Sequence, residues 1–214
     1  MKAVVDNDIL FKGACYELLK QLISTVRANA GETGVLGSAK FVVPHKIKKS
    51  ALRRDSAIAI AALSAFLDRT HILEPTESEQ NLAADLEVAA QQTGVSLDNG
   101  ESQLCAIVVQ RFVPLLLTGD KRAITAMEKL IDVDVRLMPI CGKVRCLEQL
   151  VWDAVIGGDH LGLRNAVCSE PEIDKSLSIC FSCTAEAVVS GNTTEGLQSY
   201  VEALRTEATR VLST

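Results

Sequence analysis

Four acidic residues of this 214-residue chain lie at the ends of predicted strands or at the start of a predicted helix. Asp6 directly follows an apolar, β-branched segment that favours a buried strand, and Asp120 follows the most uniformly apolar run of the chain. Asp98 and Glu101 flank the start of a predicted helix. Because open α/β sheets bind ligands beyond the carboxyl ends of their strands, we expect these four carboxylates to meet at one edge of one sheet.

Such a cluster of carboxylates has a definite chemical use. Neighbouring carboxylates repel one another and raise each other's pKa values unless a cation compensates their charge. Mg²⁺ and Mn²⁺ are hard cations that take oxygen ligands of this kind. They serve phosphoryl chemistry by activating a water molecule and by stabilising the attacking and leaving oxygens. The pattern therefore predicts hydrolysis of phosphodiester bonds without a protein nucleophile.

Each of the four acids also has a simpler interpretation, which the sequence leaves open. Asp6 can end its strand or cap the helix that follows, and Asp120 can be a turn residue. Asp98 can cap the next helix, whose first turn gains a favourable negative charge from Glu101.

The elements expected to position these acids alternate between strands and helices. Such alternation predicts an α/β fold of three layers, α/β/α, with a mostly parallel central sheet. The expected strands lie near residues 4–5, 40–44, 71–74, 113–118 and 133–138. The expected helices lie near residues 11–26, 50–68, 76–93, from 101 onward, and 121–130. No strand is evident after residue 141, so we expect an α/β domain at 1–140 and a helical extension at 141–214, with helices at 147–156 and 194–212.

Composition narrows the class of protein. No apolar run reaches the ~18 residues of a membrane span, and two aspartates interrupt the only candidate signal region, so a soluble, cytoplasmic protein is expected. The seven cysteines are then expected to be reduced, and the single pair Cys180 and Cys183 falls short of a structural zinc site. A net charge of −5 argues against indiscriminate nucleic-acid binding but allows a local basic surface.

One basic stretch stands out in this acidic chain, and we expect it near the carboxylates, where a phosphate backbone would pass. Its predicted nucleic-acid-binding residues are Lys46, Lys48, Lys49, Arg53 and Arg54, with Lys40 and His45 beside them. Ordinary solvated lysines at a helix start are the alternative. Phe41 is the nearby aromatic residue, and we expect it to pack inward.

Three segments, in this order, resemble the PIN-domain family of metal-dependent ribonucleases over about residues 1–140. They are Val4-Val5-Asp6-Asn7-Asp8-Ile9-Leu10, Gly100-Glu101 with Ala106-Ile107 behind it, and Leu116-Leu117-Thr118-Gly119-Asp120-Lys121. The resemblance implies a parallel sheet between helices and one or two Mg²⁺ or Mn²⁺ ions. It implies an endoribonuclease acting on RNA, in many members the toxin of a toxin–antitoxin pair.

By the same resemblance, Asp6, Glu101 and Asp120 are the catalytic residues and metal ligands. Asp98 is a further ligand or holds a metal-bound water, and Asp8 is a looser match. The chain departs from the family after its second strand, where an acid is often found and lysines stand here. A catalytically inactive PIN-like module, acting in protein assembly or nucleic-acid binding, is therefore the alternative.

Two further interpretations concern partners and other classes of α/β protein. The extension at 141–214 can cover the site, form a homodimer or dock an antitoxin-like protein. A phosphatase-like or nucleotide-binding protein is a third possibility for the whole chain, although no glycine-rich phosphate loop is found for it.

Overall fold

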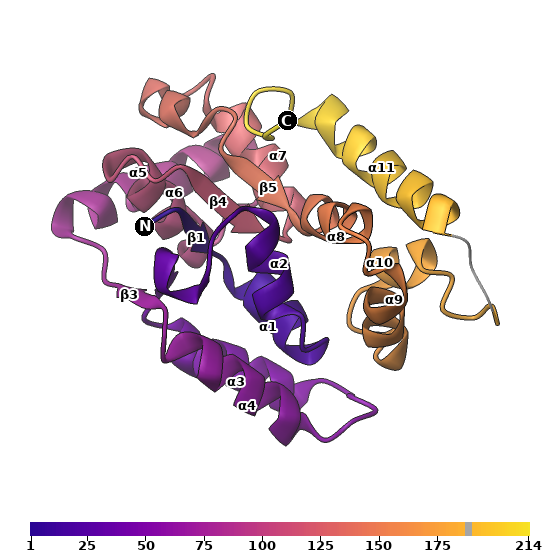
Figure 1. Ribbon diagram of the computed structural model, residues 1–214. Coiled ribbons are helices and arrows are strands. Elements are labelled where there is room, and N and C mark those ends of the chain that lie inside the picture. Colours follow the sequence, from indigo (N-terminus) through magenta and orange to yellow (C-terminus); the bar gives the residue numbers. More distant parts are fainter. Residues whose placement is uncertain (187–189) are drawn as a thin grey trace.

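A parallel sheet forms the centre of the computed structural model, which describes residues 1–186 and 190–214 (Figure 1). Within these residues the strand order is β3-β2-β1-β4-β5, and every neighbouring pair is parallel. The strands are β1 (Ala3–Val5), β2 (Thr33–Leu36), β3 (His71–Leu73), β4 (Leu115–Thr118) and β5 (Val144–Cys146). Helices cover both faces of the sheet, which confirms the predicted α/β class and its three layers.

The strand order reverses beside the central strand. From β1 the chain builds β2 and then β3 on one side, and it returns to place β4 and β5 on the other side of β1. The carboxyl ends of β1 and β4 therefore lie side by side at the reversal. In open α/β sheets, crevices for ligands form at this point because the flanking connections run in opposite directions.

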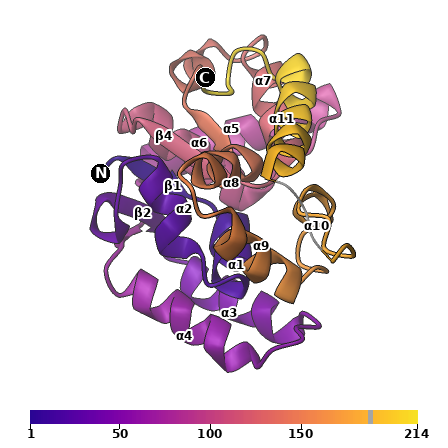
Figure 2. The ribbon, with the colours of Figure 1, turned by 45° about the vertical axis from the view of Figure 1, so that its right-hand side comes forward.

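One face of the sheet is covered by helices from both ends of the chain (Figures 1 and 2). Ala3 and Val5 of β1 point to this face, as the alternation of a strand requires. Its helices are α1 (Asn7–Cys15), α2 (Leu19–Thr25), α3 (Ala39–Lys49), α4 (Ser56–Leu67), α8 (Leu147–Ile156), α9 (His160–Ser169) and α10 (Lys175–Cys180).

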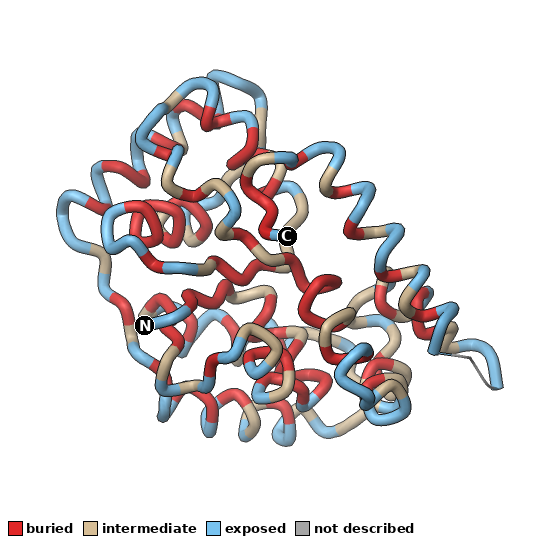
Figure 3. Tube along the Cα trace, turned by 45° about the horizontal axis from the view of Figure 1, so that its top comes forward, coloured by how far each residue is buried: buried red, intermediate tan, exposed pale blue. Residues whose placement is uncertain are grey.

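The opposite face receives Val4 of β1 and Leu116 of β4. Its helices are α5 (Glu77–Thr93), α6 (Asn99–Gln110), α7 (Lys121–Leu130) and the 3₁₀ segment η2 (Val135–Ile140). The long helix α11 (Ser190–Glu207) contributes buried residues to both clusters. Figure 3 shows the result, with buried strands between helices whose outer turns are exposed.

Two predicted strands are helical in the structure. Residues 40–44 belong to α3, because Ala39, Val43 and Ile47 recur at the helical interval of four and are all buried. The strand β2 lies instead in the glycine-rich connection that precedes α3. Gly34 fits there because a Cβ atom would overlap the side chains of Met1 and Leu73.

The second wrong strand, 133–138, is largely replaced by η2, and its Val133 and Val135 are exposed. The fifth strand is β5, within the segment expected to be entirely helical. The C-terminal segment pairs beside β5, since the Val144 N–H donates to the Val211 carbonyl at 3.0 Å. The sheet thus includes residues from beyond position 140.

Other elements follow the sequence more closely. The helix α5 has the expected capping box between Thr76 and Glu79 and ends at Gly94, which adopts a left-handed conformation. The predicted helix 11–26 is divided into α1 and α2, and α4 begins after Asp55 rather than Ser50. None of the helices described has the length and apolar composition that crossing a bilayer requires.

The expectation of reduced thiols is wrong for one pair of cysteines. Cys168, at the end of α9, and Cys183, just after α10, form a disulfide with their Cα atoms 5.0 Å apart. The turn between α9 and α10 brings them together across 15 residues of sequence, a proximity that spacing alone does not reveal. The other five cysteines are free.

Candidate functional site

A cleft of about 550 Å³ opens where the strand order reverses, at the carboxyl ends of β1 and β4. It gathers the four predicted acids from segments more than 100 residues apart, and it adds Asp8. The cleft also contains two cations, Lys46, which was expected near the carboxylates, and Arg122, which was not. Its charged lining residues are Asp6, Asp8, Asp98, Glu101, Asp120, Lys46 and Arg122.

Asp6 lies deepest among these aspartates, with 7% of its surface exposed. It caps α1 by accepting a hydrogen bond from the Asn7 N–H at 2.7 Å. The Thr118 hydroxyl, at the end of β4, donates to its other carboxylate oxygen at 3.1 Å. Burial, and then the charge of Asp8, raises the pKa of Asp6 to about 6 despite these hydrogen bonds.

Glu101 and Asp98 form a reciprocal capping box at the start of α6. The Asp98 carboxylate accepts from the Glu101 N–H, and the Glu101 carboxylate accepts from the Asp98 N–H, both at 2.9 Å. Glu101 is 7% exposed. Burial raises its pKa to about 8, and the charges of Asp98, Asp120 and Asp6 add to this effect. In the described residues no cation forms an ion pair with Asp6 or Glu101.

Asp120 differs because it has a cationic partner. It caps α7, and the guanidinium group of Arg122 binds its outer oxygen at 2.8 Å. Burial alone would raise the pKa of Asp120, but the hydrogen bonds from Arg122 hold it below its usual range. The Arg122 side chain is 78% exposed, so an ion that competes for Asp120 can displace it into solvent at little cost.

Asp8 is compensated more completely. The ammonium group of Lys12 lies 2.6 Å from one carboxylate oxygen, and that of Lys46 lies 3.2 Å from the other. Lys12 also binds Asp174, from the helical extension, at 2.8 Å. Lys46 stands on α3, in the region where the family pattern often has an acid. A fixed ammonium group thus neutralises this side of the cleft.

The acids of the cleft offer oxygen ligands for a divalent cation. Across the described residues, no three His, Cys, Asp or Glu side chains converge as a ready-made metal-binding group. Nevertheless, Asp6 and Glu101 supply buried oxygen atoms with no ion-pair partner in the described part of the chain, and such oxygens suit Mg²⁺ or Mn²⁺. Asp120 can join them once Arg122 turns away. The donor set fits one ion better than two, because Asp8 is already neutralised.

Comparisons with known proteins find no relative of this chain. No family model, no curated protein and no solved structure matches it.

The predicted basic residues separate into two groups. Lys46, Lys48 and Lys49 are exposed along α3, and Lys46 reaches the cleft. The other two hold the loop between α3 and α4, whose N–H groups at Arg53 and Arg54 donate to the buried Glu170 at 2.8 Å. The Arg54 guanidinium also binds Glu17 at 2.7 Å, and neither arginine lines the cleft.

Sequence reasoning missed Lys12, Thr118 and Arg122 as parts of the site. Thr118 and Arg122 each lie two residues from Asp120, so the end of an apolar strand was a usable signal for both. For Lys12, the spacing of four from Asp8 on one helix was a signal for the first contact. Its contact with Asp174 depends on tertiary packing.

The stability of the metal-free protein should depend on the protonation of Glu101. Since its pKa of about 8 lies above the ordinary value of 4.5, the folded state binds the proton more tightly than the unfolded state. Its contribution to stability is complete below about pH 4.5 and is lost as the pH rises through about 8. Between pH 5 and 8.5 in EDTA, the Tm of the wild type should fall relative to that of Glu101→Gln.

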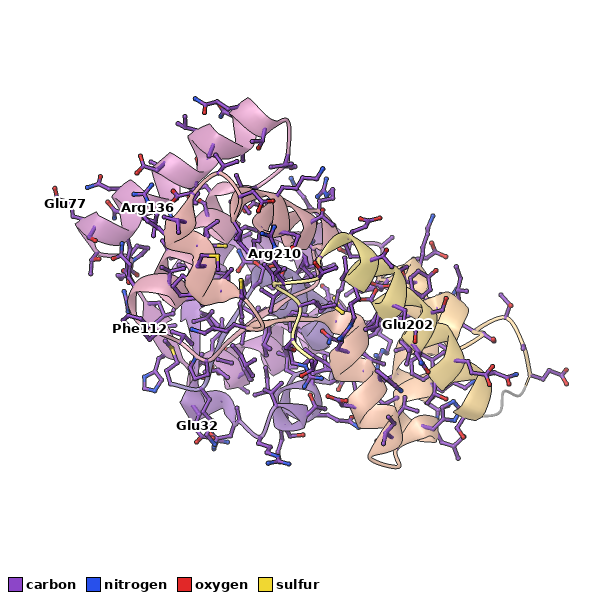
Figure 4. The ribbon with its side chains drawn as sticks, turned by 90° about the horizontal axis from the view of Figure 1, so that it is seen from above. Glu32, Glu77, Phe112, Arg136, Glu202 and Arg210 are labelled. Atoms are coloured by element: carbon purple, nitrogen blue, oxygen red, sulfur yellow. A yellow bond between two sulfur atoms is a disulfide. The ribbon has the colours of Figure 1, made fainter. Side chains whose placement is uncertain are left out.

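Thermal melts followed by circular dichroism at each pH measure this difference. Glu77→Gln is the matched control, because Glu77 projects into solvent from the start of α5 (Figure 4). Parallel Tm curves for the wild type and Glu101→Gln would show that the raised pKa is not present in solution.

Proposed function

We propose that this protein is a Mg²⁺- or Mn²⁺-dependent endoribonuclease that hydrolyses RNA phosphodiester bonds. The observation that carries the proposal is the buried pair of acids, Asp6 and Glu101, which lies where the strand order reverses and has no ion-pair partner among the residues that the structure describes. Burying carboxylates without compensation costs stability, and such sites are typical of function. An oxygen-only donor set favours a hard cation over zinc or copper.

In this proposed reaction, some residues of the cleft would bind the metal ion and others would bind the phosphate. Asp6 and Glu101 would hold the cation, with Asp120 joining them and Asp98 fixing the carboxylate of Glu101 through the capping box. The ion, when bound, supplies an activated water and charge stabilisation for phosphoryl transfer. Arg122, once displaced from Asp120, is a cation at the cleft mouth able to bind a phosphate oxygen. Lys46 supplies a second such charge.

A second candidate function is supported by the ion pairs themselves. Lys12 and Lys46 neutralise Asp8, and Arg122 forms an ion pair with Asp120. The protein's own cations therefore neutralise part of the acidic lining of the cleft. A PIN-like module that binds nucleic acid or a protein partner without catalysis would keep these ion pairs, because it does not need free carboxylates for a metal ion.

Metal-dependent cleavage separates these two functions. We expect Mn²⁺ to bind in calorimetry and to support cleavage of RNA in a panel of single-stranded and structured RNAs and DNAs. Asp120→Asn keeps a helix-capping side chain and should lower cleavage at least about tenfold. Asp68→Asn, an exposed aspartate outside the cleft lining, is the control and should cleave normally. Absence of both Mn²⁺ binding and cleavage would leave the binding module as the better function.

A further inference from the structure

An aromatic side chain lies on the outer face of α3, where the sequence led us to expect it to pack inward. Phe41 is 78% exposed, and its neighbour Val42 is 47% exposed. The helix explains this difference, because Ala39, Val43 and Ile47 occupy the buried face and turn Phe41 outward. In Figures 1 and 2, α3 and α4 form the lower edge of the molecule.

The exposed side chains line a shallow groove of about 510 Å³ along α3. Phe41, His45 and Lys49 follow one another at intervals of four residues, so they form one stripe on the helix. Val42 and Lys46 line this groove and also line the acidic cleft. The groove and the cleft therefore adjoin at these two side chains.

The charge of this surface is opposite to that of the whole protein. The helix α3 contains four lysines and one histidine and no acidic residue, whereas the chain carries a net charge of −5. Lys48 and Lys49 are exposed, and no ion pair within the described residues engages either ammonium group. A concentrated positive charge on an acidic protein favours a polyanionic partner.

We propose that the outer face of α3 binds a single-stranded nucleic acid, with one base stacked on Phe41 and backbone phosphates on Lys46 and Lys49. An exposed aromatic ring amid lysines is the combination that binds unpaired bases, whose faces are free to stack. A duplex hides those faces in its own stack. The groove then leads the strand toward the acidic cleft. This last step rests on the proposed function, whereas binding at α3 requires no metal.

Fluorescence anisotropy with a labelled 12-nucleotide single-stranded RNA, in EDTA, measures binding without cleavage. The wild type should bind, and Phe41→Ala should weaken binding about five- to 100-fold, with Phe41→Trp restoring it. Lys49→Gln should weaken binding and reduce the slope of log K against log salt concentration by about 0.7. Phe112→Ala is the matched control, because Phe112 is 75% exposed at the end of α6, outside the groove (Figure 4).

Several results would overturn the inference. These are equal binding by the wild type and Phe41→Ala, equal affinity for a duplex of the same sequence, or no binding of the RNA at all. Self-association that Phe41→Ala abolishes, in the absence of RNA binding, would assign the face to a second copy of the chain. Binding that depends on Phe41 without any Mn²⁺-dependent cleavage would support the inference and count against the proposed nuclease. Mn²⁺-dependent cleavage that Phe41→Ala leaves unchanged would support the proposed nuclease and count against the inference.

Discussion

Replacing Asp6 by asparagine is expected to lower Mn²⁺-dependent RNA cleavage by roughly a thousandfold or more, because a charged metal ligand is lost from the centre of the site. Asp6 is the acid that joins β1 to β4, through its position after Val5 and its hydrogen bond from Thr118. Asparagine is as good a helix cap as aspartate, and its single amide oxygen can still accept from the Asn7 N–H. Its amide NH₂ group takes the place of the other oxygen and can donate to the Thr118 hydroxyl.

The same substitution should not weaken the fold. The pKa of Asp6 is raised to about 6, so ionising this carboxyl group above that pH costs stability in the folded state relative to the unfolded state. Removing that charge should leave the metal-free Asp6→Asn protein at least as stable as the wild type at pH 8. Loss of cleavage with a raised or unchanged Tm therefore separates a catalytic role from a structural one.

Single-turnover cleavage and thermal melting on the same preparations measure both effects. Asp55→Asn is the matched control, since Asp55 caps α4 in the same way and lies outside the cleft. Its cleavage rate should equal that of the wild type. If Asp6→Asn cleaves as fast as the wild type in the presence of Mn²⁺, the activity arises elsewhere or from a contaminant.

The prediction of the acidic cluster from sequence succeeded because its cause is local. Asp6 and Asp120 each follow a strand and cap the next helix, and both signals can be read within a few residues. Parallel strands then bring their carboxyl ends together at one edge of the sheet. The simpler interpretation of Asp6 and Asp98 as helix caps is also confirmed, and Asp120 caps α7 where a turn residue was the alternative. The same side chains therefore cap helices and line the cleft.

The wrong predictions of secondary structure have a different cause. They depend on which side chains of a segment pack into the core. The sequence segment containing Phe41 is compatible with a strand, and its helical form is decided by burial of Val43 and Ile47. Gly34 reads as a turn residue, yet it lies in β2 because Leu73 occupies the space beside it. Such choices are made by tertiary packing and are not encoded in local periodicity.

The partners of Asp8 show how the extension takes part in the cleft. Lys12 lies between Asp8 and Asp174, with 14% of its side chain exposed, and the two carboxylates are similarly shielded. Burial alone would lower the pKa of Lys12, but the charges of Asp8 and Asp174 raise it above its ordinary value. The lysine therefore favours its charged form, and it connects the segment before α10 to the acidic cleft.

Replacing Lys12 by methionine should therefore destabilise the protein by about 1–3 kcal/mol, because two partly buried carboxylates lose their shared cation. Urea unfolding at pH 7.5 measures this change, and Lys20→Met, at an exposed position of α2, should change stability by less than about 0.5 kcal/mol. Adding Asp8→Asn to Lys12→Met should recover part of the loss, since one unpaired charge is removed.

The same variant should bind a divalent cation in the cleft better than the wild type does. With Lys12 absent, Asp8 keeps the weaker contact with Lys46 and becomes available to a divalent cation. Lys12→Met should therefore gain more stability from added Mn²⁺ than the wild type gains, because the ion replaces the missing ammonium charge. An unfolding free energy equal to that of the wild type in EDTA would show that Lys12 does not carry this contact between the extension and the cleft.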